Sequence, residues 1–332
     1  MRQFFPLLGL ALFFWASGEA FAHFAEPPAE KKAPPSAAET LAPYVDAQTL
    51  VVAHVDLNAF EPMKTIDWLT GILGLSPRDR DNIQSQAAPI SVVTQGLPKG
   101  QSVSVYVVIS LSDIGRLPFF LVLPLDDHTP AIPIATEARR ELEKAWNRKV
   151  ASDRVGDALV VGSPETIERL KKAKPVARPE IDAALSAVDE GAVQIALIPS
   201  PDMRRLAEAL LPEAPKQLGG GPTKTFTQGA VWAALSIDLP PHKVEARLVI
   251  QSVDAAAAVA LDRRLATAID AIAALPSVRD GAPNFAEVAR RLVPKPDGDQ
   301  LKIVLDEEEG DVTAGLKLLG PLLRVILNAG GK

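Results

Sequence analysis

Apolar and polar positions along residues 41 to 328 follow two periods in turn, and this pattern predicts strands that alternate with helices. A β-branched run such as TLVVAHVDL at residues 49 to 57 is typical of a buried strand. Apolar residues at a spacing of three and four follow it and are typical of a helix. The elements predicted for the first half are strands at 49 to 57, 102 to 111 and 117 to 125, a strand and a helix within 154 to 173, a helix within 58 to 75 after the break at Pro62, and helices at 77 to 93 and 135 to 146.

The second half repeats this order of patterns. Pro201 is placed at the start of a helical stretch, where proline is well tolerated, and a Pro-Pro-His turn separates two alternating runs that read as a hairpin. The elements predicted for the second half are strands at 192 to 200, 229 to 239, 243 to 253 and 299 to 308, and helices at 201 to 211, 254 to 275 and 312 to 327.

Each half therefore has the order strand, helix, strand, strand, helix, strand, which is that of a ferredoxin-like module. We predict an α+β protein built by tandem duplication, with modules at residues 41 to 178 and 179 to 332. The crossover rule predicts helices on one face of an antiparallel sheet. We favour one continuous sheet, because pairing of the two modules removes exposed strand edges.

The segment RVGDALVVGSPETIERLKKA, residues 154 to 173, raises the question of a phosphate site. A helix start explains it better, because Ser163 can cap the helix, Pro164 suits its first turn and Glu165 complements its dipole. Both halves carry a Gly-Asp pair before the strand, but the second half then places acidic residues 306 to 309 where a phosphate would bind. Because the second copy has acidic residues at the equivalent position, we interpret the turn in the first copy as structural.

The paired Gly-Asp, strand and helix units, together with the duplicated α+β order, resemble a broad group of exported bacterial proteins of unknown function. The resemblance spans residues 41 to 328 and is one of pattern. It implies a location in the cell envelope and no known catalysis. It transfers no functional residue.

The N-terminus has the pattern of a secretory signal peptide at residues 1 to 22. Arg2 precedes an apolar run from Phe4 to Ala16, which is shorter than the ~20 residues of a membrane span, and a small-residue cleavage site follows. Residues 23 to 40 are rich in proline, alanine and charge and predict a disordered spacer. We therefore expect an exported chain, periplasmic or extracellular, with no transmembrane span after cleavage.

The amino-acid composition limits the kinds of partner that the chain can bind. The formal net charge of -6 argues against nucleic acid, because binding to phosphate backbones needs a basic face. The chain has no cysteine, which excludes disulfides and a lipid anchor on cysteine. The expected partner is a protein or a small molecule of unknown identity.

No residue pattern assigns a catalytic, cofactor-binding or metal site. The four histidines, His23, His54, His128 and His242, are too far apart in sequence to pair on one helix face. His54 lies within a predicted strand and is interpreted as a satisfied sheet histidine. Cleavage would make His23 the N-terminal residue and a possible copper ligand, but it then heads a disordered spacer, so its position is interpreted as adventitious.

The sequence thus predicts a non-catalytic binding or scaffolding protein of the bacterial envelope, with a ligand groove between the two modules. One alternative is an envelope enzyme or metalloprotein that uses carboxylates assembled by the fold, such as Asp56, Asp157 and Asp299. Another is a carrier of an apolar ligand held under the helices.

Overall fold

A computed structural model describes residues 37–59, 61–73, 80–81, 103–125, 131–174, 176–188, 191–216, 219–281, 284–308 and 310–317. The signal peptide, most of the spacer, the helix expected at 77 to 93 and the end of the C-terminal helix lie outside these residues. The described chain begins with α2 (Ala37–Leu41), within the expected spacer. Leu41 of this helix is completely buried and belongs to the core cluster.

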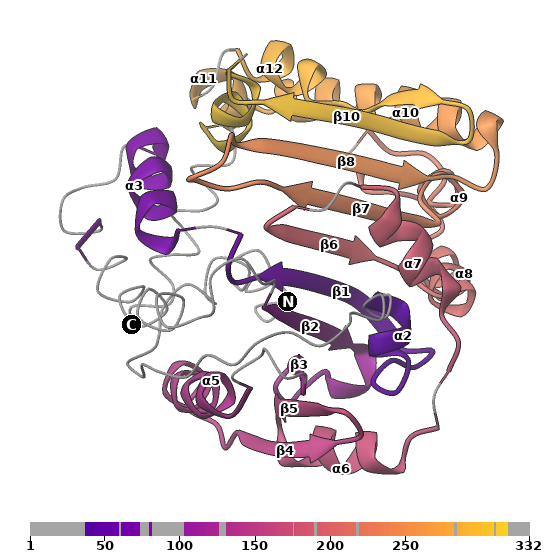
Figure 1. The fold of residues 1–332 in the computed structure, drawn as a ribbon. Coiled ribbons are helices and arrows are strands. Elements are labelled where there is room, and N and C mark those ends of the chain that lie inside the picture. The colour runs from indigo at the N-terminus through magenta and orange to yellow at the C-terminus, as the bar shows by residue number, and fades with distance from the viewer. Residues whose placement is uncertain are drawn as a thin grey trace.

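The strands form one ten-stranded sheet in the order β4-β5-β3-β2-β1-β6-β7-β8-β10-β9 (Figure 1). The preference for a continuous sheet is confirmed. The strands are β1 (Thr49–Asp56), β2 (Ser104–Ser110), β3 (Phe119–Pro124), β4 (Ala151–Val155), β5 (Ala158–Gly162), β6 (Val193–Leu197), β7 (Trp232–Ile237), β8 (Glu245–Gln251), β9 (Lys295–Asp297) and β10 (Gln300–Asp306).

The ferredoxin-like strand order is wrong. A split βαβ unit needs parallel neighbours joined by a helical crossover, whereas every strand pair among the described residues is antiparallel. Two features cause this. The strands on either side of the first helix, β1 with β2 and β6 with β7, are direct antiparallel neighbours. Each half also has an additional strand, β4 or β9. Because β4 turns directly into β5, β5 runs antiparallel to β3 and takes the place beside it.

Both halves nevertheless share one strand order. The first half reads β1-β2-β3-β5-β4 outward from the centre, and the second reads β6-β7-β8-β10-β9. The two halves meet where β1 pairs with β6, with Ala53 opposite Ile195. The sheet therefore has two halves of equal topology that extend in opposite directions from a central antiparallel pair.

Helices cover both faces of the sheet, not the single face that the sequence predicted. On one face α2, α6 (Pro164–Lys172) and α7 (Pro179–Ser186) share a buried cluster with Val52, Val108 and Phe120. On the other face α5 (Ala131–Trp146) packs over Val107, Phe119 and Leu121. Consecutive residues of β3 thus enter opposite cores. The uninterrupted apolar run FFLVL in β3 is typical of a strand buried on both faces, so the sequence already indicated that helices cover both sides.

The remaining helices surround the second half. They are α3 (Pro62–Leu73), α8 (Pro201–Leu210), α9 (Lys224–Gly229), α10 (Ala255–Ala273), α11 (Pro276–Gly281) and α12 (Phe285–Arg291), and a short 3-10 turn, η1 (Leu111–Asp113), follows β2. Figure 1 draws α7 and α10 on opposite sides of the sheet. Residues 311–317 form the described part of the C-terminal helix.

Candidate functional site

The VGSPE turn starts a helix, as the sequence predicts. Ser163 precedes α6, and its Oγ accepts a hydrogen bond of 3.1 Å from the backbone N–H of Thr166. Pro164 occupies the first turn, and Glu165 places a carboxylate near the positive end of the helix dipole. The N–H group that a bound phosphate would need is already satisfied by the cap.

The Gly-Asp pair common to both halves forms a hairpin turn. Gly156 connects β4 to β5 with φ +59°, and Gly298 connects β9 to β10 with φ +63°. A two-residue hairpin needs this left-handed backbone, which glycine adopts without a steric penalty. The shared motif therefore builds the fold at two equivalent positions.

A buried ion-pair network lies beneath the first turns of α6. Asp113 is completely buried, and it accepts a hydrogen bond of 2.8 Å from the Thr166 hydroxyl. Arg169 reaches it from the next turn of α6, with Nη2 2.6 Å from Asp113 Oδ2. The other guanidinium nitrogen of Arg169 lies 2.7 Å from Asp46 Oδ2. Because a buried carboxylate needs such partners, the network joins η1, α6 and the segment before β1.

Arg178 extends the same network to the junction of the two halves. It donates to the backbone carbonyls of Asp46 at 2.6 Å and of Ile198 at 2.7 Å. Ser110 also donates to Asp46 Oδ1, at 3.2 Å. Apart from Arg169 Nε, which is buried without a hydrogen-bond partner among the described residues, the polar groups of this network bind one another and the backbone. We interpret it as a structural clamp, without a reactive group presented to solvent.

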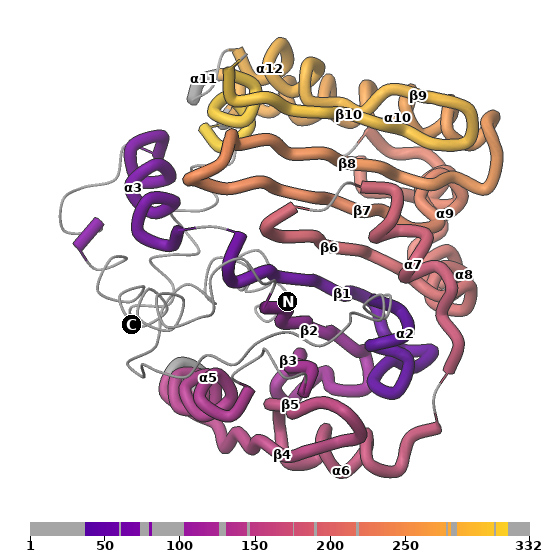
Figure 2. The backbone as a smooth tube through the Cα atoms, in the orientation of Figure 1, coloured from indigo at the N-terminus to yellow at the C-terminus, as the bar shows by residue number. Residues whose placement is uncertain are grey.

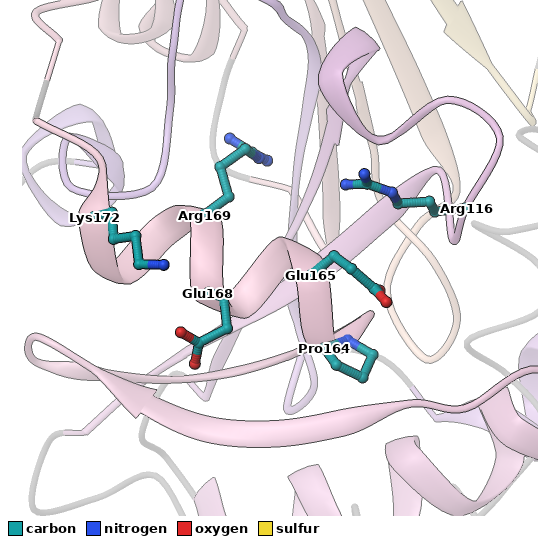
Figure 3. A pocket seen from close by; sticks show the side chains of 6 residues that line it. All are labelled: Arg116, Pro164, Glu165, Glu168, Arg169 and Lys172. Carbon is teal, nitrogen blue, oxygen red and sulfur yellow. The ribbon is translucent and has the colours of Figure 1, made fainter.

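A shallow, open depression runs along the outer surface of α6 (Figure 3). Its lining mixes charges of both signs and consists of Arg116, Pro164, Glu165, Glu168, Arg169 and Lys172. The Arg169 guanidinium pairs with the two aspartates of the clamp, and two glutamates remain in the lining. With Arg169 paired to the clamp, Arg116 and Lys172 are balanced by Glu165 and Glu168, so the lining has no excess positive charge to favour phosphate.

His54 is a satisfied sheet histidine, as predicted. Its Nδ1 lies 3.1 Å from Gln194 Oε1, and its Nε2 lies 2.9 Å from Ser104 Oγ. Its ring packs at a centroid distance of 5.0 Å from Tyr106, and burial raises the pKa of that tyrosine. Both ring nitrogens are engaged by neighbouring strands, which leaves the imidazole a structural role.

The three candidate carboxylates do not form one site. Asp157 lies in the β4–β5 turn at one edge of the sheet, and Asp299 lies in the β9–β10 turn at the opposite edge (Figure 2). Asp56 Oδ1 accepts a backbone hydrogen bond of 2.9 Å from Asn58. Among the described residues, no three His, Cys, Asp or Glu side chains are grouped as a metal site. His23 and His128 lie outside these residues, and His242 is exposed in the β7–β8 turn.

The groove expected between the modules is replaced by a strand ladder. Residues Val51 to Val55 of β1 pair with β6 in a continuous antiparallel register. The described part of the junction therefore has no gap between the two sheet halves. A binding surface must be sought on the helices or on the sheet faces.

Helix α8 presents such a surface, and its orientation is unusual. Every residue of this described helix is at least partly exposed. Leu206 and Leu210 have exposed fractions of 55% and 75%, and Leu211, just after the helix, has 49%. Met203, Leu206 and Leu210 recur at a helical spacing of three and seven, so they form one apolar stripe. A globular helix ordinarily buries this stripe.

The polar side of α8 faces the protein instead. Arg204 donates a hydrogen bond of 3.3 Å to the carbonyl of Thr227 in α9. The Thr227 hydroxyl in turn donates to the Glu208 carboxylate. Arg204 and Glu208 are four residues apart and share one side of the helix. These polar contacts hold α8 with its apolar stripe turned to solvent.

The sequence predicted α8 as a helix but gave no reason to select it as a site. The stripe was visible in the sequence, whereas the choice between core and solvent depends on its tertiary contacts. Its N-terminus is well defined by Ser200, whose Oγ accepts from the Met203 N–H at 3.3 Å, and by Pro201. A capped, regular helix with an exposed stripe is the candidate functional site.

Comparison with family models, with curated proteins and with solved structures finds no match to this chain. Within the described ranges, no helix is both long and apolar enough to cross a membrane.

Proposed function

We propose that this chain is an exported, non-catalytic binding or scaffolding protein that docks on a partner protein through α8. The observation that carries the proposal is the apolar stripe of α8, in which Leu206 and Leu210 are exposed and Met203 is partly exposed, on a helix that turns its polar side inward. Contiguous exposed apolar residues on a soluble domain mark interaction surfaces. The partner expected for this geometry is a protein with an apolar groove that accepts a helix.

Two features favour a protein groove over a lipid surface. Anchors at intervals of three and seven residues match the way amphipathic helices fill a groove. Interfacial membrane helices are instead rich in lysine and arginine on their polar side. In α8, Arg204 and Arg205 are balanced by Asp202 and Glu208, so the helix has no net charge to attract an anionic bilayer.

Export is the second part of the proposal, and the N-terminal sequence supports it. The test is N-terminal sequencing of the chain after fractionation of cells that express the whole coding sequence. We expect the envelope or secreted form to begin at His23. A chain that keeps Met1 and stays in the cytosol would refute export but would leave docking through α8 unaffected.

The docking test places a photo-crosslinking amino acid at Leu206 or Leu210 in living cells, with Arg205 on the same helix as the matched control position. We expect one discrete heterologous protein adduct from the two apolar positions and much less from position 205. The captured protein, once purified, must bind the wild-type chain and bind a Leu206→Asp, Leu210→Asp variant about tenfold or more weakly.

Other adducts would overturn the proposal. A crosslinked dimer of this chain would identify a second copy as the occupant, and lipid adducts would identify the membrane. Equal yields at positions 205, 206 and 210 would show that nothing docks on the stripe.

We also infer that the two halves arose by duplication of one α+β unit. Their common strand order and the equivalent Gly156 and Gly298 turns support this origin. Under this inference, α8 is the second-half counterpart of α3, since each follows the first strand of its half.

A further inference from the structure

The chain that follows α8 turns back on itself next to the end of the helix. The Thr223 N–H donates a hydrogen bond of 3.0 Å to the Pro212 carbonyl, and the Ala214 N–H donates one of 2.8 Å to the Gly221 carbonyl. The bonded positions approach each other along the chain, which is the pattern of two antiparallel arms. We call the described residues of 212–223 the α8 hairpin.

The returning arm of the α8 hairpin lies against α10. Gly219 and Gly221 have φ of +84° and +77°, a left-handed backbone that glycine adopts without a steric penalty. Arg264 of α10 donates a hydrogen bond of 3.1 Å from Nη1 to the Gly219 carbonyl, and its guanidinium lies 5.4 Å from the centre of the Phe226 ring. A Cβ at Gly221 would lie only 3.3 Å from the same nitrogen. These contacts hold the arm in a fixed place beside α8.

Three exposed cations surround the α8 hairpin. Lys216 lies at the end of its outgoing arm, Lys224 directly follows the hairpin, and Arg263 lies on α10. Arg263 is one helical turn from Thr267, whose side chain lies 2.9 Å from the position that a Cβ on Gly219 would take. Within the part of the chain that the structure describes, no carboxylate forms an ion pair with any of these three cations. Their charge is therefore available to a partner.

The two ends of the α8 docking surface differ in charge. At the N-terminal end, Asp202 and Arg205 pair with each other. At the C-terminal end, the exposed Leu211 is followed by the α8 hairpin, whose first backbone bond places Lys224 beside it. Glu213 is the only acidic residue of the hairpin sequence. The docking surface thus has a neutral end and a cationic end, and such an asymmetry can fix the orientation of a bound partner.

We propose that the partner's groove carries carboxylates at the end that receives Leu211, where they contact Lys216, Lys224 and Arg263. This inference rests on the function proposed for α8, and it adds the charge of the partner and the direction in which α8 lies in the groove. An acidic protein fits better than an anionic membrane, because lipid-binding clusters contain about four to eight lysines and arginines.

The first test uses a carbodiimide, which condenses a lysine amine with a carboxylate in direct contact and leaves no spacer. The protein captured by the photo-crosslinker at Leu206 or Leu210 is purified and mixed with the full-length chain. We expect amide crosslinks from Lys216 and Lys224 to aspartate or glutamate of that protein. Lys172, an exposed lysine on α6, is the matched control and should give none.

The failure of this inference is distinct from the failure of the proposed function. A captured protein that forms no amide crosslink with Lys216 or Lys224, or forms as many with Lys172, would overturn the acidic groove and leave docking through α8 intact. If no protein is captured at Leu206 or Leu210, the proposed function and this inference fail together.

A second measurement is the association rate of the same two proteins at low and high salt. Lys216→Glu with Lys224→Glu should lower the rate about tenfold at low salt and weaken its salt dependence, because charges at the rim steer association. Lys172→Glu should change it by less than about twofold. Equal losses in both variants would show an effect of net charge alone and contradict the inference.

Anionic phosphatidylglycerol vesicles provide the lipid comparison. We expect the wild-type chain to bind them no better than the Lys216→Glu, Lys224→Glu variant does. Vesicle binding that is strong in the wild type and lost in this variant would assign the two lysines to a membrane surface and refute the acidic groove.

Discussion

Helices α3 and α8 follow the first strand of their respective halves, yet they meet the rest of the molecule in opposite ways. In α3, Ile66, Leu69 and Leu73 are buried and pack against Ala192 and Leu239. In α8, every residue is at least partly exposed, and the leucines face solvent. Both helices are amphipathic, so the stripe itself does not distinguish them.

The difference lies in what each helix meets. The apolar stripe of α3 packs against the border of the sheet and against Leu239, two residues after β7. Helix α8 meets α9 instead, through the bonds of Arg204 and Glu208 to Thr227. A helical pattern therefore identifies the apolar side of a helix, and the polar anchors decide whether that side turns inward.

The largest expected loss of stability is at the buried carboxylate beneath α6, compared with a partly exposed carboxylate in the second half. Asp113 is completely buried beneath α6 and pairs with Arg169. We expect Asp113→Ala to lower the free energy of unfolding by about 3–5 kcal/mol, because it leaves a partly buried guanidinium without this partner. Denaturant unfolding measures it. Asp306→Ala, at the end of β10, is the control and should cost far less, because its partner Lys243 is exposed. Equal losses would contradict this contrast.

The next effect concerns α3 and α8 directly. Ile66 is completely buried, so Ile66→Ala should cost about 2–5 kcal/mol of unfolding free energy through lost packing and a cavity. Leu206→Ala in α8 should change stability by no more than about 0.5 kcal/mol, since its side chain is largely exposed. Urea denaturation of both variants measures this pair. Losses of similar size would show that α8 is packed inward in solution.

A smaller effect tests the helix start that was once a candidate phosphate site. Ser163→Ala removes the cap of α6 and should lower stability by about 1 kcal/mol. Ser163→Thr keeps the hydroxyl and is the control. Inorganic phosphate should leave the unfolding midpoint of the wild type unchanged. If phosphate raises the unfolding midpoint of the wild type but not that of Ser163→Ala, the turn does bind an anion and our interpretation is wrong.

The smallest expected change in stability concerns Asp238, which lies next to Leu239 of the α3 cluster. Burial raises the pKa of Asp238, so the folded chain holds a proton there more tightly than the unfolded chain does. The carboxylate therefore costs stability at neutral pH, and that cost disappears as pH falls below the unfolded pKa. Asp238→Asn should stabilise the protein slightly at pH 7 and lose this advantage in acid. Unfolding midpoints across pH measure the difference; an advantage that grows in acid would refute it.

Strong periodic segments allowed correct prediction of the α+β class, the continuous sheet and most described elements. The helix expected after Pro62 from the apolar spacing is α3, Pro62–Leu73. Strand β4 was missed because ASDRV carries three polar residues in a row and only its ends are apolar. That omission explains the direction of β5, since a hairpin and a single strand return the chain in opposite directions. The direct antiparallel pairing of β1 with β2 was also missed, and it excludes the predicted strand order by itself.

The candidate site was less predictable than the fold. Ser163 as a cap and His54 as a satisfied sheet residue follow from local chemistry, and both were predicted. The clamp of Asp46, Asp113 and Arg169 joins residues far apart in sequence, so no local sequence pattern predicts it. The exposure of α8 depends on Thr227 in another helix, and only the tertiary structure shows that contact.

The most direct test of the central claim is thiol labelling of Leu210→Cys in α8 and Leu69→Cys in α3, in a chain that has no other cysteine. In the purified protein we predict rapid reaction of Leu210→Cys and strong protection of Leu69→Cys. In cells that contain the partner, Leu210→Cys should become protected. A Leu210→Cys thiol that is as protected as Leu69→Cys in the purified protein, or that reacts equally fast in cells, would contradict the account.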